Sequence, residues 1–160
     1  MNPMTETVED QLRALTERVA ALESSPPDRD AFWALTGIKK RTPDAVMIVG
    51  SVTLPTGEPV EWQETFGAGG LLESEWSDVA SSLAALGHPV RVELLRHILS
   101  GVHSTADLAT VEALGTTGQL HHHLRQLVAT GWVRHGGRGN YEVPAARVIP
   151  LLACIAGAQR

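Results

Sequence analysis

The sequence has only one cysteine, Cys154, so it cannot form a disulfide within the chain. A chain without disulfides suits a reducing compartment, and we expect this protein in the cytoplasm. A basic segment followed by an apolar one is missing from the N-terminus, which argues against a secretory signal peptide. The longest apolar stretch, Val148 to Ala158, contains Pro150 and is too short to span a bilayer. These absences predict a soluble protein without a membrane partner.

Positive charge is scarce in the first half of the chain. Residues 1–80 hold six basic and fourteen acidic side chains, a net charge of −8, whereas residues 81–160 hold seven arginines and four acidic side chains, a net charge of +3. The total of −5 argues against a nucleic-acid partner, but the asymmetry suggests nucleic-acid contact by the second half. A solvated acidic helix at the front would give the same distribution, so charge leaves both interpretations open.

Apolar residues near the N-terminus repeat at the heptad spacing of a coiled-coil seam, and they are Val8, Leu12, Leu15, Val19 and Leu22. Residues 1–25 are therefore predicted to form a coiled-coil dimerisation helix that ends at Ser24-Ser25-Pro26-Pro27. The alternative is a helix that packs its stripe on its own domain. We favour self-association because the seam is narrow and a proline linker isolates it. Little more than two heptads would need a second dimer contact.

Residues 28–72 are predicted to form a module of one short helix and a β-hairpin. The helix is expected from Asp30 to Lys40, and two β-rich runs, 45–54 and 59–66, flank a turn at 55–58. An isolated hairpin is barely stable in water, so this one must lie on another part of the protein or pair with a second copy. A protein partner or small ligand, if there is one, is expected here.

The module also carries aromatic side chains that are candidates for lining such a ligand site, namely Trp33, Trp62 and Phe66. Packing into a core is the more usual role of large apolar residues, and it is the role we expect for these three.

Residues 75–160 carry the signals of a helical domain. A first helix is expected to end at Gly87, and Pro89 suits the first turn of the next one. Two further helix starts follow, at Ser104 and Thr116, the second with the capping-box pattern that ends in Gln119. Two short helices that meet at a tight glycine turn are the layout of a helix-turn-helix.

Two short strands, 132–134 and 141–143, are predicted around a glycine-rich tip that contains arginine and asparagine. This hairpin is typical of a wing, which contacts a neighbouring groove or phosphate. It is not a nucleotide phosphate-binding loop because no helix N-terminus follows it. A C-terminal helix is expected over residues 145–158, with one apolar side suited to packing or dimer formation.

Three motifs follow one another in this half of the chain: LAALGHPVRVELL over 83–95, LHHHLRQL over 120–127 and GWV over 131–133. In this order and spacing they resemble the ArsR-type winged helix-turn-helix regulators. The resemblance implies transcription regulation and an α+β, mainly α, fold. In this chain the winged helix-turn-helix domain is preceded by a coiled-coil helix and a β-hairpin module, and the front eighty residues lie outside the common family core.

The resemblance assigns the helix after Gly115 to the major groove of double-stranded DNA. With Leu120, Leu124 and Leu127 buried, helical geometry turns the opposite side chains outward. The expected DNA contacts of this helix and the wing are Thr117, Gln119, His121, His122, Arg125, Gln126, Arg134, Arg138 and Asn140. Arginine suits guanine and glutamine suits adenine, while the wing side chains suit phosphates or the minor groove. A homodimer would place two reading helices ~34 Å apart on an inverted-repeat operator.

Other functions stay open. One alternative is a protein-interaction regulator that uses a winged helix without its own operator, and another is a sensor of a metal or small ligand. The run His121–His123 invites a metal, but helical neighbours lie about 100° apart and cannot converge on one ion. The cysteine pair of ArsR-type metal sensors is also absent from residues 90–95, so we expect no metal and no cofactor.

No catalytic motif places a nucleophile or a carboxylate pair, so we expect no enzyme. Cys154 lies in an apolar segment, where a structural cysteine is the expected interpretation.

Overall fold

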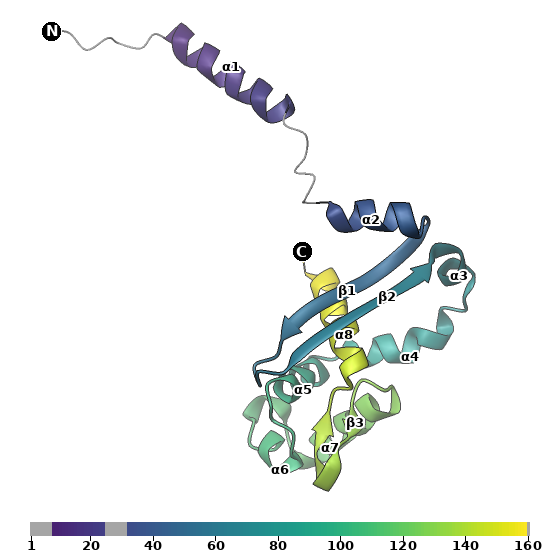
Figure 1. Ribbon diagram of the computed structural model, residues 1–160. Helices are drawn as coiled ribbons and strands as arrows, with labels where there is room; N and C mark the ends of the chain where they lie inside the picture. Colours follow the sequence, from purple (N-terminus) through teal and green to yellow (C-terminus); the bar gives the residue numbers. More distant parts are fainter. Residues whose placement is uncertain (1–7, 25–31, 160) are drawn as a thin grey trace, which may run out of the picture. The chain divides into compact units, whose positions relative to one another are not determined.

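The computed structural model describes residues 8–24 and 32–159, and it divides into two compact units, Met1–Pro43 and Asp44–Arg160 (Figure 1). The first unit holds α1 (Val8–Ser24) and α2 (Trp33–Arg41). The second holds β1 (Ala45–Thr53), β2 (Pro59–Gly67), α3 (Ala68–Glu73), α4 (Ser77–Leu86), α5 (Pro89–Leu99), α6 (Thr105–Leu108), η1 (Glu112–Leu114), α7 (Thr117–Ala129), β3 (Arg134–His135), η2 (Gly137–Gly139), β4 (Tyr141–Glu142) and α8 (Ala145–Ala158). The fold is mainly helical with two small antiparallel sheets, which confirms the α+β, mainly α class.

α1 presents its predicted heptad seam to solvent. The side chains of Val8, Leu12, Leu15 and Val19 are all exposed, and the side chain of Leu22 lies outside the described part of the chain. The polar positions carry a long Arg13–Asp10 ion pair of 3.9 Å, which adds little stability because both partners are solvated. The seam thus remains uncovered within the described residues of a single chain.

α2 lies in the same compact unit as α1, whereas the β-hairpin that follows it lies in the other unit. Trp33 is 68% exposed, so the expectation that it packs in a core is wrong. The tryptophan occupies the first position of a nine-residue helix that has no buried residue, and nothing in that short helix covers an indole.

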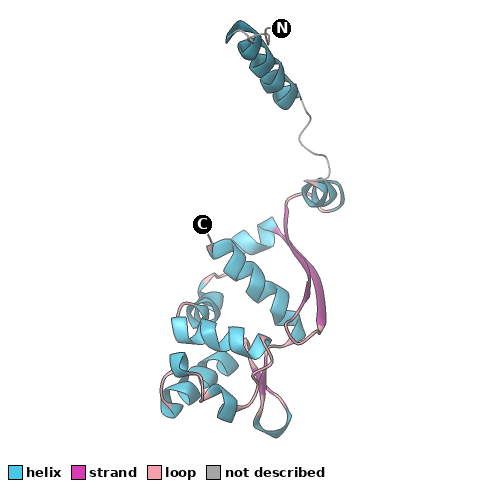
Figure 2. Ribbon diagram, turned by 90° about the vertical axis from the view of Figure 1, so that its left-hand side faces the viewer, coloured by secondary structure: helices cyan, strands magenta, loops and turns pink. Residues whose placement is uncertain are grey.

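β1 and β2 form the predicted hairpin, with Ala45 opposite Gly67 at one end and Thr53 opposite Pro59 at the other. One face lies on α8, where Val60, Val148 and Ile149 form a small buried cluster (Figures 1 and 2). Gly50 permits this contact because a Cβ there would stand 2.8 Å from Cγ2 of Ile149. The hairpin therefore gains the support that it needs from the last helix of its own chain.

A larger core lies under α5 and α7. Leu120, Leu124 and Leu127 are at most 1% exposed, as their spacing predicts. Two side chains fasten α4 to this core: the Arg91 guanidinium donates to the carbonyls of Ala84 and Ala85, and the indole of the buried Trp132 donates to the carbonyl of Ser82. The Arg91 bonds reach carbonyls in the last turn of α4, where the helix itself supplies few donors.

Several predicted elements have different limits in the structure. α3 occupies the stretch that the glycine-rich sequence after Phe66 marked only as the end of the hairpin. The helix predicted after Ser104 is divided into α6 and η1, and both wing strands are shorter than expected. The wing pairs only Arg134–Glu142 and His135–Tyr141, because the chain turns at Gly136 to accommodate η2.

The apolar helix α8 does not bury its cysteine. Its buried side chains are Val148, Ile149 and Leu151, whereas Cys154 is exposed. That this cysteine is structural rather than reactive stays a prediction. No helix in the described ranges is long and apolar enough to cross a membrane.

Candidate nucleic-acid interface

The N-terminus of α7 is fixed by the predicted capping box. The Thr116 hydroxyl accepts from the backbone N–H of Gln119 at 3.4 Å, and the side-chain oxygen of Gln119 accepts from the backbone N–H of Thr116 at 3.0 Å. Gly115 precedes them at φ 78°, a left-handed conformation that glycine adopts without strain. The turn and the cap together set the direction in which α7 leaves the core.

The capping box has a consequence for Gln119. A bidentate contact with adenine needs the amide oxygen as an acceptor and the amide nitrogen as a donor. The oxygen of Gln119 already accepts from the backbone amide and the hydroxyl of Thr116. Gln119 can therefore offer its NH₂ group to a ligand, but a bidentate contact would require the cap to open.

The remaining predicted contacts on α7 form one exposed face. Thr117, His121 and Arg125 follow one another at intervals of four residues and therefore stack along the helix. His122 and Gln126 form the adjacent row and are also exposed. Arg125 donates from Nε to the carbonyl of His121 at 3.4 Å, a long bond that holds the guanidinium loosely. This face combines a cation with neutral donors and acceptors.

His123 points away from that face. It is half-buried, its ring centroid lies 4.5 Å from that of His88, and its Nδ1 is buried without a hydrogen-bond partner in the described chain. Burial, with the nearby charges of His88, Arg91 and His122, holds the pKa of His123 below its usual value. A neutral His123 is therefore the form that the folded protein favours near neutral pH.

The three consecutive histidines do not converge on one point, because His121 and His122 are exposed while His123 packs inward. In the described ranges, no group of three or more His, Cys, Asp or Glu side chains is placed to hold a metal ion.

The wing is anchored to the loop after α5. Tyr141 donates its amide to the carbonyl of His103 at 2.9 Å, and Nδ1 of His103 bonds the carbonyl of Tyr141 at 3.0 Å. Across the strands, Arg134 donates to Glu142 at 2.5 Å. Asn140 is exposed and pairs through its backbone with Ser104. These bonds hold a hairpin that its two strand pairs would not hold alone.

Of the predicted wing contacts, Arg134 and Asn140 are therefore both on the surface, and Arg134 is already paired with a carboxylate. The side chain of Arg138 lies outside the described part of the chain, although its backbone belongs to η2.

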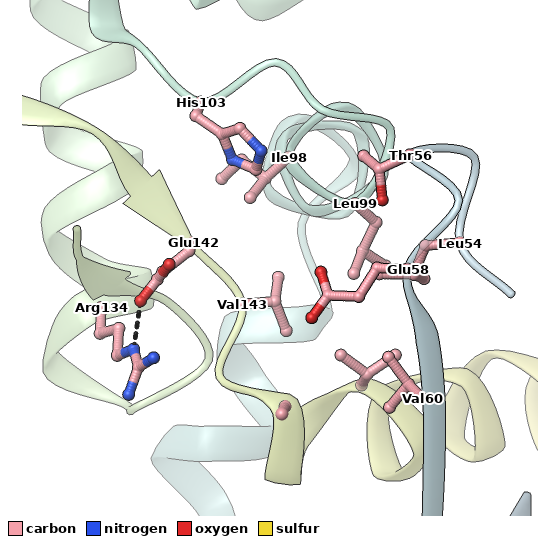
Figure 3. Close-up of a pocket in the computed structure, with 12 residues that line it drawn as sticks. Leu54, Thr56, Glu58, Val60, Ile98, Leu99, His103, Arg134, Glu142 and Val143 are labelled. Atoms are coloured by element: carbon pink, nitrogen blue, oxygen red, sulfur yellow. Dashed lines mark hydrogen bonds and ion pairs between the residues drawn. The ribbon is translucent and has the colours of Figure 1, made fainter. Parts of the chain in front are cut away.

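A pocket of about 260 Å³ lies between the β1–β2 turn and the wing (Figure 3). Its apolar floor comes from β2, α5 and α8, and its polar groups come from the two hairpins and from the loop after α5. No motif in the sequence indicates this site. The lining residues are spread from position 54 to position 148, so no local spacing could reveal them.

A second hollow, of about 690 Å³, is mostly apolar. Trp62 and Phe66 line it from β2, Leu83 lines it from α4, and Cys154 lines it from α8. Both aromatics are half-buried, so the core packing expected for them is only partial, and both also line this hollow. Val79, on the predicted apolar face of α4, also lines this hollow. Trp76, which belongs to the same predicted face, is exposed.

No family model, curated protein or solved structure matches this chain. Its function must therefore be inferred from the side chains and their geometry.

Proposed function

We propose that this protein is a sequence-specific, DNA-binding transcriptional regulator of the ArsR type, located in the cytoplasm, with a winged helix-turn-helix within residues 83–143. The observation that carries the proposal is the exposed polar face of α7. That helix buries three leucines on one side, has a capped start and lies near a short glycine-rich hairpin. Such a helix has the shape and the surface groups that enter a major groove.

In this role Arg125 and His122 contact base edges near the middle of α7, while Thr117, His121 and Gln126 flank them. Gln119 contributes its NH₂ group and keeps its oxygen in the cap. The wing residues Arg134, Arg138 and Asn140 contact phosphates, which position the protein without reading sequence.

We further propose that the protein acts as a homodimer on an inverted-repeat operator. The exposed heptad seam of α1 supports this proposal, because an apolar seam at this spacing is covered by a second helix in a coiled coil. One seventeen-residue helix is marginal by itself. The exposed apolar side of α4, with Leu83 at 57% exposure, and the adjoining side of α8 offer the second contact.

The proposal is tested by selecting bound sequences from a random DNA pool with the full-length protein, and then measuring affinity for the selected site. We expect an inverted repeat, and we expect Arg125→Ala to weaken binding by about tenfold to a hundredfold. Arg96→Ala removes the same charge from an exposed position of α5, where Arg96 pairs with Glu93, and serves as the matched control. Equal affinities of the two variants would show that α7 is not the reading helix.

A protein-interaction regulator without its own operator is the second candidate, and the exposed apolar face of α4 favours it. Val79 and Leu83 are large side chains that a protein partner would cover as well as a second copy would. The salt dependence of DNA binding separates the two candidates. A regulator that grips phosphates loses affinity steeply as salt rises, whereas a protein without a DNA role shows no specific complex to measure.

A further inference from the structure

The pocket beside the wing has a floor of hydrocarbon. Leu54 and Val60 come from the β1–β2 hairpin, Leu99 comes from α5, and Val143 follows the wing (Figure 3). Leu99 and Val143 each pack against both apolar cores of this unit. The pocket therefore lies where the hairpin layer meets the helices beneath the wing, and its volume of about 260 Å³ suits only a small ligand.

The polar groups of this pocket are mainly acceptors. The carboxylate of Glu58 points toward Val143, as Figure 3 shows, and it has no hydrogen-bond or ion-pair partner among the described residues. Glu142 adds a second carboxylate. Because a carbonyl can only accept, the bond from His103 to the Tyr141 carbonyl places the His103 proton on Nδ1. The other ring nitrogen, Nε2, accepts only when the ring is neutral.

Arg134 is the one cation in the described lining. Its Nε donates to Glu142 at 2.5 Å, and its two terminal NH₂ groups remain as donors on a side chain that is 64% exposed. Thr56 contributes a hydroxyl, which donates or accepts. With two carboxylates against one guanidinium, the lining favours a ligand that brings positive charge to Glu58 and Glu142 and a hydrocarbon body to the floor.

We propose that this pocket binds a small organic ammonium ion, and that the bound cation competes with Arg134 for Glu142. The ammonium group donates to Glu58 and Glu142, and its hydrocarbon part covers Leu99 and Val143. Arg134 is then released from its carboxylate and becomes available to a DNA phosphate. This second step rests on the proposed function, whereas binding of the cation does not.

The direction of the regulation follows from the charges. Without ligand, the Glu142 carboxylate neutralises the charge of Arg134, one of the wing residues that we propose to contact DNA phosphates. With ligand, the carboxylate is neutralised by the ammonium ion instead, and the surface near the phosphates becomes more positive. The ligand therefore strengthens DNA binding, and DNA strengthens ligand binding by the same factor.

The binding step is tested by titrating the full-length, isotopically labelled protein with cyclohexylammonium and following its amide NMR signals. Cyclohexanol and cyclohexanecarboxylate have the same ring without the positive charge. We expect the ammonium ion alone to bind, with a Kd on the order of 1 mM, and to shift the amides of Glu58, Leu99 and Val143. No binding by about 10 mM, or equal binding of the carboxylate, would overturn the proposal.

Two variants locate the site. Glu58→Gln should weaken the binding of cyclohexylammonium by about tenfold or more, because it removes the unpaired carboxylate. Glu61→Gln is the matched control, since Glu61 lies three residues further along, in β2, and its carboxylate accepts from the Ser51 hydroxyl. Ala145→Leu keeps every charge and places a larger side chain in the lining, so it should also abolish binding. Undiminished binding by folded Glu58→Gln and Ala145→Leu proteins would place the cation elsewhere and refute the assignment.

The regulatory step is tested on DNA selected as above. Saturating cyclohexylammonium should raise the affinity of the wild-type protein by about fivefold or more. Glu142→Gln should raise affinity without ligand and should no longer respond to it, because Arg134 is already released. Unchanged or lower affinity of Glu142→Gln would refute the coupling. Failure of the wild-type protein to bind any DNA would refute the proposed function and leave the result of the NMR titration intact.

Discussion

The apolar core beneath α7 and the one beneath the β1–β2 hairpin lie in the same compact unit, but they are built on different scales. The first contains twelve buried residues drawn from α4 to α8, and it fixes the helix that we assign to DNA. The second contains three, Val60, Val148 and Ile149, and it fixes a hairpin to α8. A core of twelve residues resists local change better than a core of three, so the hairpin layer is the adjustable part of this unit.

The largest loss of stability is expected when a central leucine of the larger core is truncated. Leu124 is fully buried under α7, and Leu124→Ala should lower the free energy of unfolding by about 3–5 kcal/mol because a cavity remains in a well-packed core. Urea denaturation followed by circular dichroism measures the loss. Leu72→Ala, at a position of α3 that is 71% exposed, is the control and should change stability by about 0.5 kcal/mol or less.

Truncation in the small core should cost less and should act locally. Ile149→Ala removes the side chain against which Gly50 packs, and we expect a loss of about 2 kcal/mol. Hydrogen exchange should accelerate in β1 and β2 while the amides of α5 and α7 keep their protection. Val49→Ala changes an exposed position of the same hairpin and should leave exchange unaltered. Equal acceleration in both layers would show that the two cores unfold as one.

Removal of the α7 cap tests how firmly the larger core holds the N-terminus of α7. Thr116→Ala deletes the hydroxyl that accepts from the Gln119 amide, and we expect a loss of about 1 kcal/mol. Thr117→Ala, one position later and exposed, is the matched control. Thr116→Ala also removes one of the two donors to the Gln119 oxygen and leaves the backbone amide of residue 116 as the other.

The smallest effect concerns pH. Because burial lowers the pKa of His123, the unfolded chain binds a proton at a higher pH than the folded protein does. The contribution of His123 to stability is therefore fully present above its ordinary pKa and is lost as the pH falls from there toward the lower folded value. His123→Leu should flatten the dependence of unfolding free energy on pH in this window, while His121→Leu, on the exposed face, should not. An unchanged slope in His123→Leu would assign the pH dependence to another group.

The sequence was most informative where neighbouring residues determine the structure. The capping box at Thr116 and Gln119, the turn at Gly57 and the limits of α8 all depend on residues close together in the chain, and all three agree with the structure. Hydrophobic periodicity likewise identified the buried leucines of α7.

Long-range packing was much less accessible. The periodicity of α8 showed an apolar helix but not that the hairpin would cover Ile149 and leave Cys154 in solvent. The pocket at Glu58 and Glu142 depends on two hairpins meeting beside Leu99, which no motif encodes. The predicted lengths of the wing strands were too great. The chain turns at Gly136, and this turn ends the strand pairing although the flanking side chains favour strands.

The contact between Gly50 and Ile149 joins two segments that the ribosome synthesises at different times. The ribosome synthesises the hairpin about a hundred residues before the helix that covers it, roughly 5 to 20 s earlier at ordinary elongation rates. During that interval the apolar face at Val60 has no α8 on which to lie. A nascent chain halted before α8 therefore exposes a complete hairpin with one uncovered face, which is a substrate for chaperones and a starting point for aggregation.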